Sequence, residues 1–221
     1  MPQAHQTERA LLLAAVKEMA RLGLVSGLSG NASIRLPTER GEERFLITPA
    51  GKDYSKLTAG GLVAVDGDIE PVDGDGIPST ESLLHIAIYR ARPDVGAVMH
   101  THSVHATALA VAGRPIPPVM DEMVVYLGGQ VEVADYGFPG SEELAAAAVN
   151  ALGDRRAVLL RNHGLCGAGA TPDEALRACM LAERAAQIFL LAQAAGGAKL
   201  LPADAVAAER AAYLMRSGLK G

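Results

Sequence analysis

The sequence is poor in cysteine and in aromatic residues: 221 residues include two cysteines, three phenylalanines and no tryptophan. Cys166 and Cys179 cannot build a disulfide framework and lack the close spacing of a metal-binding pair, so we expect a protein of the reducing cytoplasm. No apolar run approaches the roughly 18 residues of a membrane span. The N-terminus, MPQAHQTERALLLAAVKEMARLG, mixes charged with apolar residues and does not resemble a signal peptide.

A strong charge of one sign is also lacking. The formal net charge is −5, and no long basic run occurs. Nucleic acid and anionic membrane surfaces are therefore not expected as main partners.

Hydrophobic residues are plentiful, at 49%, and so is glycine, with 24 residues. This composition is typical of a packed α/β domain and not of a disordered chain. The length suits one sizeable core, and we find neither an internal repeat nor a long linker. We therefore expect a single α/β domain over residues 1–221.

The spacing of apolar residues predicts alternating helices and strands along the chain. Thr171 is the expected N-cap of a long helix with Pro172 at its first position, and Ser79 or Thr80 is expected near the N-cap of another. A D-G turn joins two short strands within 62–71. Helices are predicted over 7–22, 78–94, 103–113, 121–128, 141–152, 171–197 and 203–216, and further strands over 31–36, 44–49, 95–102 and 157–162.

Histidines are concentrated in the segment VMHTHSVHATALA, where three of the chain's six fall within 100–105. His100 and His102 share one face of a predicted strand, since side chains alternate along a strand. His163 follows another predicted strand, and Glu81 lies near the start of a predicted helix. Three imidazoles and one carboxylate would suit Zn²⁺, although Mn²⁺, Co²⁺ and Fe²⁺ also accept such ligands.

A histidine at a strand end is by itself more often a structural residue than a ligand. The combination of H-x-H, a separate N-H-G and a helix-start glutamate favours a metal site. His5 and His85 keep the structural interpretation. His85 follows Glu81 by four residues on the same predicted helix and could either orient that carboxylate or simply pack.

Three loops rich in small and hydroxyl residues could bind an anion: SGLSGNAS (26–33), TPAG (48–51) and PST (78–80). Exposed backbone N–H groups and helix N-termini favour anions. Each loop alone is typical of an ordinary turn, but beside a metal site the three suggest phosphate binding. No Walker A loop and no G-x-G-x-x-G occurs, so nucleotide binding is not indicated.

Taken in order, the segments RLGLVSGLSGNASIRL, ITPAGKDYSKL, PSTESLLHIAIYRARPDVGAVMHTHSVHATALA and AVLLRNHGL resemble the class II aldolase/adducin superfamily, over residues 8–195. The resemblance is strongest to its bacterial sugar-phosphate aldolases of the fuculose-1-phosphate type. It implies a three-layer α/β/α sandwich with a mixed, largely antiparallel central sheet. It also implies a homotetramer whose active sites lie between subunits.

The same resemblance implies roles for individual residues. His100, His102 and His163 match the metal ligands, and Glu81 matches a catalytic acid/base that can also ligate the metal. Ala50 stands where related enzymes carry a hydroxyl residue, which removes one phosphate contact. The positions that match the phosphate site are Gly30, Asn31, Gly51, Ser79 and Thr80.

The implied reaction is metal-dependent cleavage of a ketose 1-phosphate to dihydroxyacetone phosphate and an aldehyde, through a metal-stabilised enediolate. Asp121 falls where aldolases carry a proton-donating tyrosine. Asp121 or the adjacent Glu122 could donate that proton only if its pKa is raised. Tyr213, reaching a neighbouring subunit, is the other candidate for this second acid/base.

Alternatives to the aldolase reaction come from the same superfamily. MDEMV (120–124) resembles the segment that carries the catalytic glutamate of methylthioribulose-1-phosphate dehydratases, with Glu122 in that place. The following VVYLGGQVEVADYGFPGSEEL is more similar to the aldolases, which we therefore favour. Related epimerases and decarboxylases remain open. A non-catalytic module like the adducin head domain is disfavoured, because that domain lacks the metal ligands present here.

Overall fold

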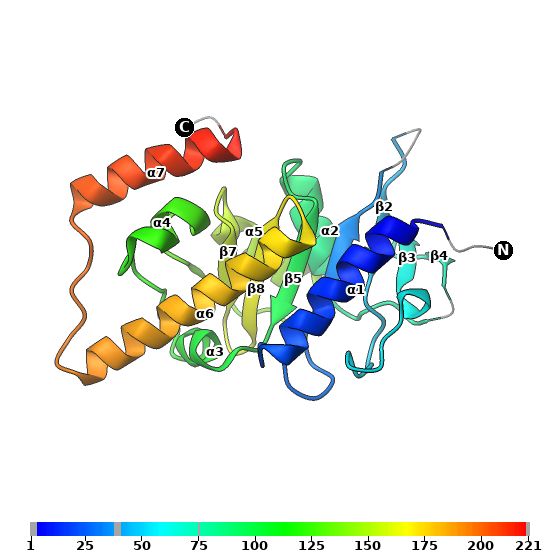
Figure 1. Ribbon diagram of the computed structural model, residues 1–221, viewed down its shortest axis with the longest axis horizontal. Coiled ribbons are helices and arrows are strands. Elements are labelled where there is room, and N and C mark those ends of the chain that lie inside the picture. Colours follow the sequence, from blue (N-terminus) through cyan, green and yellow to red (C-terminus); the bar gives the residue numbers. More distant parts are fainter. Residues whose placement is uncertain (1–3, 38–40, 75, 220–221) are drawn as a thin grey trace.

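Eight strands form one sheet within the part of the chain that the computed structural model describes, residues 4–37, 41–74 and 76–219 (Figure 1). Their spatial order is β4-β3-β2-β1-β5-β8-β7-β6. The pair β6–β7 is parallel and the other neighbours are antiparallel. The strands are β1 (Asn31–Arg35), β2 (Arg44–Ile47), β3 (Val63–Asp66), β4 (Pro71–Asp73), β5 (Ala97–Thr101), β6 (Val133–Ala134), β7 (Ala157–Leu160) and β8 (Gly164–Gly169).

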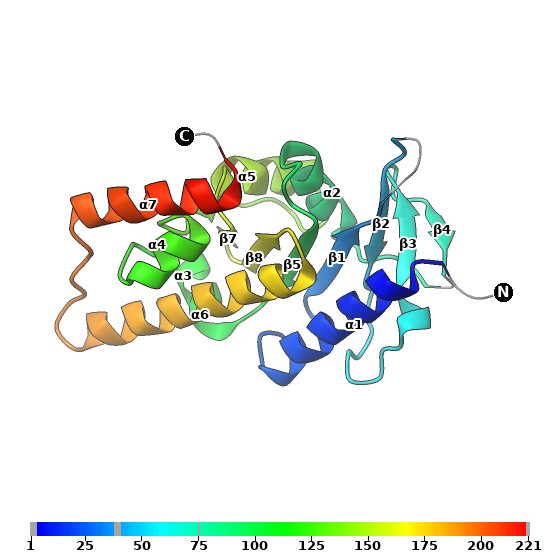
Figure 2. The ribbon, with the colours of Figure 1, turned by 45° about the horizontal axis from the view of Figure 1, so that its top comes forward.

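Helices cover both faces of this sheet, as Figures 1 and 2 show. One apolar cluster joins the sheet to α1, α3, α4 and α6, and a second joins its other face to α2 and α5. The expected three-layer α/β/α sandwich with a mixed, largely antiparallel sheet is thus confirmed. The helices are α1 (Gln6–Arg21), α2 (Ser82–Ala91), α3 (Val104–Val111), α4 (Asp121–Leu127), α5 (Glu142–Leu152), α6 (Pro172–Ala194) and α7 (Ala203–Ser217), with a short 3₁₀ turn at Ala59–Gly61.

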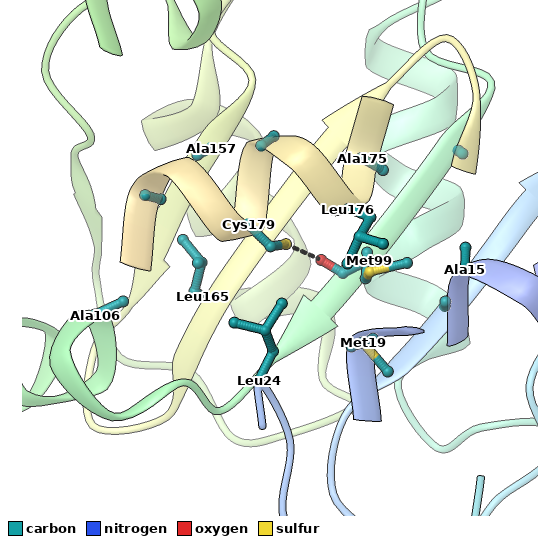
Figure 3. Close-up of a cluster of buried hydrophobic side chains, with 14 of the residues drawn as sticks. Ala15, Met19, Leu24, Met99, Ala106, Ala157, Leu165, Ala175, Leu176 and Cys179 are labelled. Atoms are coloured by element: carbon teal, nitrogen blue, oxygen red, sulfur yellow. Dashed lines mark hydrogen bonds between the residues drawn. The ribbon is translucent and has the colours of Figure 1, made fainter. Parts of the chain in front are cut away.

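Alternation along β5 divides its side chains between the two clusters. Met99 packs beneath α6 and against α1, as Figure 3 shows, and its carbonyl accepts a 3.5 Å hydrogen bond from Cys179 Sγ. Val98 lies in the opposite cluster with α2 and α5. His100 shares the side of Val98, since the two are two residues apart on one strand. The strand therefore directs His100 toward the layer that contains α2.

The interior strand β8 is the main element that the sequence did not predict. Its sequence, GLCGAG, lacks the branched and aromatic residues typical of strands. The glycines instead allow α6 to approach closely: a Cβ on Gly167 would lie 2.5 Å from Cys179 Sγ, and one on Gly169 would lie 2.5 Å from the Glu174 Cβ. Close packing of a helix, not strand propensity, explains this composition.

The long helix α6 begins as its sequence predicts. Thr171 is the N-cap, its hydroxyl oxygen accepts a 3.3 Å hydrogen bond from the Glu174 N–H, and Pro172 is the first helical residue. No helix among the described residues has the length and apolarity needed to cross a membrane.

The last helix, α7, lies across α4 (Figure 2). Tyr213 belongs to α7 and its side chain is fully buried. Its hydroxyl donates a 2.5 Å hydrogen bond to the Asp154 carbonyl. Arg210 pairs with the Asp154 carboxylate and donates to the Gly128 carbonyl at 2.8 Å. The expectation that Tyr213 reaches into a neighbouring subunit is therefore wrong for this arrangement, because its side chain packs within its own chain.

Candidate metal centre and active site

The ends of three adjacent strands bring the histidines together. His100 is the last residue but one of β5, and His102 is the first residue after this strand. His163 occupies the tight turn from β7 to β8, where Leu160 pairs with Gly164. Because β8 is also antiparallel to β5, with Leu165 opposite Thr101, this turn lies beside the end of β5. Two segments about sixty residues apart in sequence thus meet at one edge.

The three imidazoles form a compact group. Their ligand atoms all lie within 4.8 Å of one another, and His100 Nε2 is 2.8 Å from His102 Nε2. The ring centroid of His163 lies 4.6 Å from the ring centroid of His100 and 5.1 Å from that of His102. Among the described residues, these three histidines are the group of histidine, cysteine or acidic side chains close enough together to hold a metal ion.

Glu81 completes the group from the other layer. Its carboxylate oxygens lie 3.5 Å from His100 Nε2 and 3.3 Å from His163 Nε2, and the residue is only 7% exposed. Glu81 is itself the N-cap of α2, so Ser79 and Thr80 lie near the cap, as expected, and directly before it. The Ser79 hydroxyl oxygen accepts a 3.3 Å hydrogen bond from the Glu81 N–H. The start of α2 therefore fixes the carboxylate at the histidines.

His100 and His102 are held in the neutral form that binds metals. Burial lowers the pKa of His100 well below its usual range, and the neighbouring His163 and His102 lower it further. Burial, followed by His163, also lowers the pKa of His102. The Nδ1–H of His100 donates to the Leu165 carbonyl, 3.0 Å away, which leaves the Nε2 lone pair for a ligand. Three neutral imidazole nitrogens and a carboxylate are a donor set that fits a divalent cation.

Asn31 links this group to the first strand. It begins β1 directly opposite His100, and its side-chain N–H donates a 2.7 Å hydrogen bond to Glu81 Oε2. The side chain is buried together with the carboxylate. Asn31 was expected to bind phosphate. In this structure its side-chain amide contacts Glu81, the candidate acid/base.

The three loops expected to bind phosphate converge beside Glu81. Thr48, in the second loop, connects it to the other two: its N–H and hydroxyl bond to Ala32 in the first, and its carbonyl accepts from the Ser79 N–H of the third at 3.1 Å. The Ala50 N–H donates to the Ile77 carbonyl. These bonds and the bridge between Pro49 and Pro78 hold together the loops that carry the expected phosphate-binding positions, Gly30, Asn31, Gly51, Ser79 and Thr80.

Gly30 needs to be glycine for two reasons. Its φ of +75° lies in the left-handed region, and a Cβ would come 2.5 Å from the Val25 side chain and 2.8 Å from the His100 carbonyl oxygen. The first loop can therefore approach the metal strand this closely only with glycine at this position.

Glu122 is not brought to the histidines of its own chain. It lies on α4 and lines a separate cavity of about 730 Å³ together with Tyr126, Arg156 and Arg216, and none of the three histidines belongs to its described lining. Asp121, one residue earlier, lies near Glu209 of α7, whose pKa is raised by desolvation and by this neighbouring carboxylate. Neither carboxylate completes the metal group within one chain.

His105 is also explained by the structure. Its Nδ1 lies 2.7 Å from Glu183 Oε1, and the same carboxylate accepts from the backbone N–H groups of His105 and Ala106. Glu183 thus caps the start of α3 from α6. The sequence pattern missed this contact, and it missed the Leu165 carbonyl because β8 itself was not predicted.

Comparison with known proteins agrees with this geometry. The family model for the Class II Aldolase and Adducin N-terminal domain matches residues 10–190. The chain belongs to this family. Its relatives are metal-dependent lyases, and the chain is accordingly a class II aldolase-type enzyme.

Among curated relatives of this class II aldolase, an L-fuculose phosphate aldolase of Escherichia coli is 39% identical over 173 residues, which are 78% of either chain. A 5-deoxy-D-ribulose 1-phosphate aldolase of Bacillus thuringiensis is 36% identical over 199 residues, covering 90% of this chain and 92% of the relative. A solved L-fuculose 1-phosphate aldolase superimposes with a TM-score of 0.88 at 31% identity, covering 95% of this chain and 97% of the other.

Proposed function

We propose that this enzyme cleaves a ketose 1-phosphate of the fuculose-1-phosphate type to dihydroxyacetone phosphate and an aldehyde. The observation that carries the proposal is the position of Glu81, within 3.5 Å of two of the three clustered histidines and hydrogen-bonded to Asn31. An acid/base directly beside a candidate cation site is what an aldol cleavage requires.

His100, His102 and His163 would hold the cation, with Glu81 as a further ligand when substrate is absent. Zn²⁺ suits three nitrogen donors and one oxygen donor, and Mn²⁺, Co²⁺ and Fe²⁺ are the other candidates. A divalent cation supplies Lewis acidity that stabilises the negative charge developing on the substrate's oxygens.

The chain's own groups carry the proton transfers. A base removes the proton of the C4 hydroxyl, the C3–C4 bond breaks, and the aldehyde leaves with its carbonyl formed. The electron pair stays on the three-carbon fragment as the enediolate of dihydroxyacetone phosphate. Glu81 returns a proton to C3 of that fragment, while the loops around Gly30, Gly51 and Ser79 hold its phosphate.

Among the described residues, neither of the two candidate bases for the C4 hydroxyl lies beside the histidines of its own chain. Asp121 and Glu122 stand on α4, away from the described metal group, so either would act on the site of a neighbouring subunit. We therefore propose a homotetramer in the cytoplasm with active sites between subunits. The alternative reaction, a dehydration with Glu122 as the catalytic residue, would also need Glu122 from a neighbouring subunit. No observation favours dehydration over cleavage.

The names of the relatives support a proposal for the substrate class. One is a fuculose phosphate aldolase and another a 5-deoxyribulose 1-phosphate aldolase. Both substrates are ketose phosphates whose aldehyde half carries a methyl group in place of a terminal hydroxymethyl group. A deoxygenated aldehyde half is the property that we propose for the substrate here.

The decisive experiment incubates Zn²⁺-loaded protein with fuculose, ribulose, 5-deoxyribulose and methylthioribulose 1-phosphates and follows products by mass spectrometry. We expect dihydroxyacetone phosphate plus an aldehyde, abolished by a chelator. Glu81→Gln should retain metal and lose turnover; unchanged turnover would remove Glu81 from the mechanism. A product lighter than its substrate by one water would instead establish a dehydratase.

A further inference from the structure

A buried tyrosine hydroxyl lies at the junction of the three converging loops. Tyr54 follows the TPAG turn, and its ring packs in the apolar cluster on the α1 face, where only 3% of the residue is exposed. Its hydroxyl leaves that cluster and donates a 2.5 Å hydrogen bond to the carbonyl of Gly30. A residue three positions after the second loop thus holds the backbone of the first.

The same hydroxyl is connected to the third loop through Thr48. Thr48 bonds Ala32, two residues after Gly30, through its N–H and hydroxyl, and the Thr48 carbonyl accepts the N–H of Ser79 at 3.1 Å. The Gly30 carbonyl fixed by Tyr54 immediately precedes Asn31, whose amide holds Glu81. One side chain therefore determines the spacing between the loops that would receive phosphate and the start of β1.

We infer that Tyr54 is a positioning residue for the phosphate end of the substrate, because its hydroxyl fixes the 26–30 loop against Thr48 and Ser79. The inference rests on the proposed phosphate site. Tyr54 itself contacts no phosphate; it sets the positions of the groups that do. Loss of the hydroxyl should weaken phosphate binding while leaving the metal group and the proton transfers of Glu81 in place.

The test is Tyr54→Phe, which keeps the ring in its apolar cluster and removes only the hydroxyl. Tyr89→Phe is the matched control: Tyr89 is fully buried and its hydroxyl makes a 2.7 Å hydrogen bond to Ser33, but it packs in the opposite apolar cluster. Both variants lose one buried hydrogen bond, so a loss of stability alone should affect them similarly.

Two readouts separate positioning from stability. The first is the dissociation constant of inorganic phosphate, measured as protection of the metal-loaded protein against thermal unfolding. The second is the ratio of kcat/KM for a ketose 1-phosphate to that for the unphosphorylated ketose. For Tyr54→Phe we expect phosphate binding to weaken, and this ratio to fall, by about 2- to 10-fold through KM. Tyr89→Phe should change neither.

Unchanged phosphate affinity and an unchanged ratio in Tyr54→Phe would overturn the inference while the proposed cleavage stood. Equal losses in Tyr89→Phe would overturn it too, since the effect would then be structural. If the wild-type protein binds no phosphate, the inference fails, and the cleavage assay on the wild type shows whether the proposed function fails with it.

Discussion

The side-chain amide of Asn31 donates a 2.7 Å hydrogen bond to Glu81 across fifty residues of sequence. The two residues belong to different layers, one at the start of β1 and the other at the N-cap of α2. Glu81 is thereby held by a neutral donor on one side while two histidines lie on the other. The carboxylate has a fixed orientation before any substrate binds.

Asn31→Ala should lower kcat without removing the metal. A hydrogen bond to a charged acceptor contributes about 1.5–3 kcal/mol, so the loss should be about 10- to 100-fold if the bond persists in the transition state. Steady-state kinetics and metal content measured on the same preparation test this. Asn150→Ala, on the exposed side of α5, is the control. A kcat equal to that of the wild type would show that Asn31 does not orient Glu81.

His102 and His105 should respond differently to substitution. His102→Gln removes one of three clustered nitrogens, and the affinity for Zn²⁺ should fall by at least about tenfold. His105→Gln alters a side chain that pairs with Glu183 and is about one-third exposed, so the metal should stay bound. Competition with a chromophoric chelator measures both affinities. Equal loss in the two variants would contradict the assignment of the ligands.

Gly164→Ala should damage the site through packing. A Cβ at this position would lie 2.4 Å from the Thr101 carbonyl oxygen and 3.1 Å from atoms of both His100 and His102. Overpacking of this kind destabilises by about 1–3 kcal/mol, and the rings must shift as well. Urea unfolding and Zn²⁺ affinity should therefore both worsen. In Gly61→Ala, whose Cβ would meet only the ends of side chains, neither should change greatly.

His85 should make the metal-free protein less stable in acid. Complete burial lowers its pKa from 6.5 to about 3. Below pH 6.5 the unfolded chain therefore binds a proton at this position that the folded chain does not. As the pH is lowered from 6.5 to about 3, the free energy of unfolding decreases. One such group contributes about 1.4 kcal/mol per pH unit.

The measurement for His85 is urea unfolding of chelated protein at pH 7, 6 and 5. His85→Gln should show a shallower decline than the wild type, by close to one proton. The Ser33 hydroxyl, which lies 2.7 Å from His85 Nδ1, remains a partner for the glutamine amide. A pH dependence identical in the two proteins would mean that His85 titrates normally when folded.

The sequence was most informative where strand alternation and chemistry coincide. The alternation along β5 predicted that His100 and His102 act together, and the turn sequence N-H-G identified His163 as their third partner. It could not predict β8, because glycines that admit a helix carry no strand signal. Contacts made only in three dimensions were equally hidden: the bond from Asn31 to Glu81, the cap that Glu183 provides for α3, and the burial of Tyr213.

The two cysteines lie on opposite faces of the sheet, Cys166 with the α2 and α5 cluster and Cys179 with the α6 cluster. Burial raises the pKa of Cys179 to about 12 and that of Cys166 well above its usual value. Neither thiolate is available at neutral pH, since the thiolate is the nucleophile. A cysteine introduced on the exposed side of α7 would therefore be the sole site for maleimide dyes, and native thiols need not be removed before this helix is labelled for fluorescence.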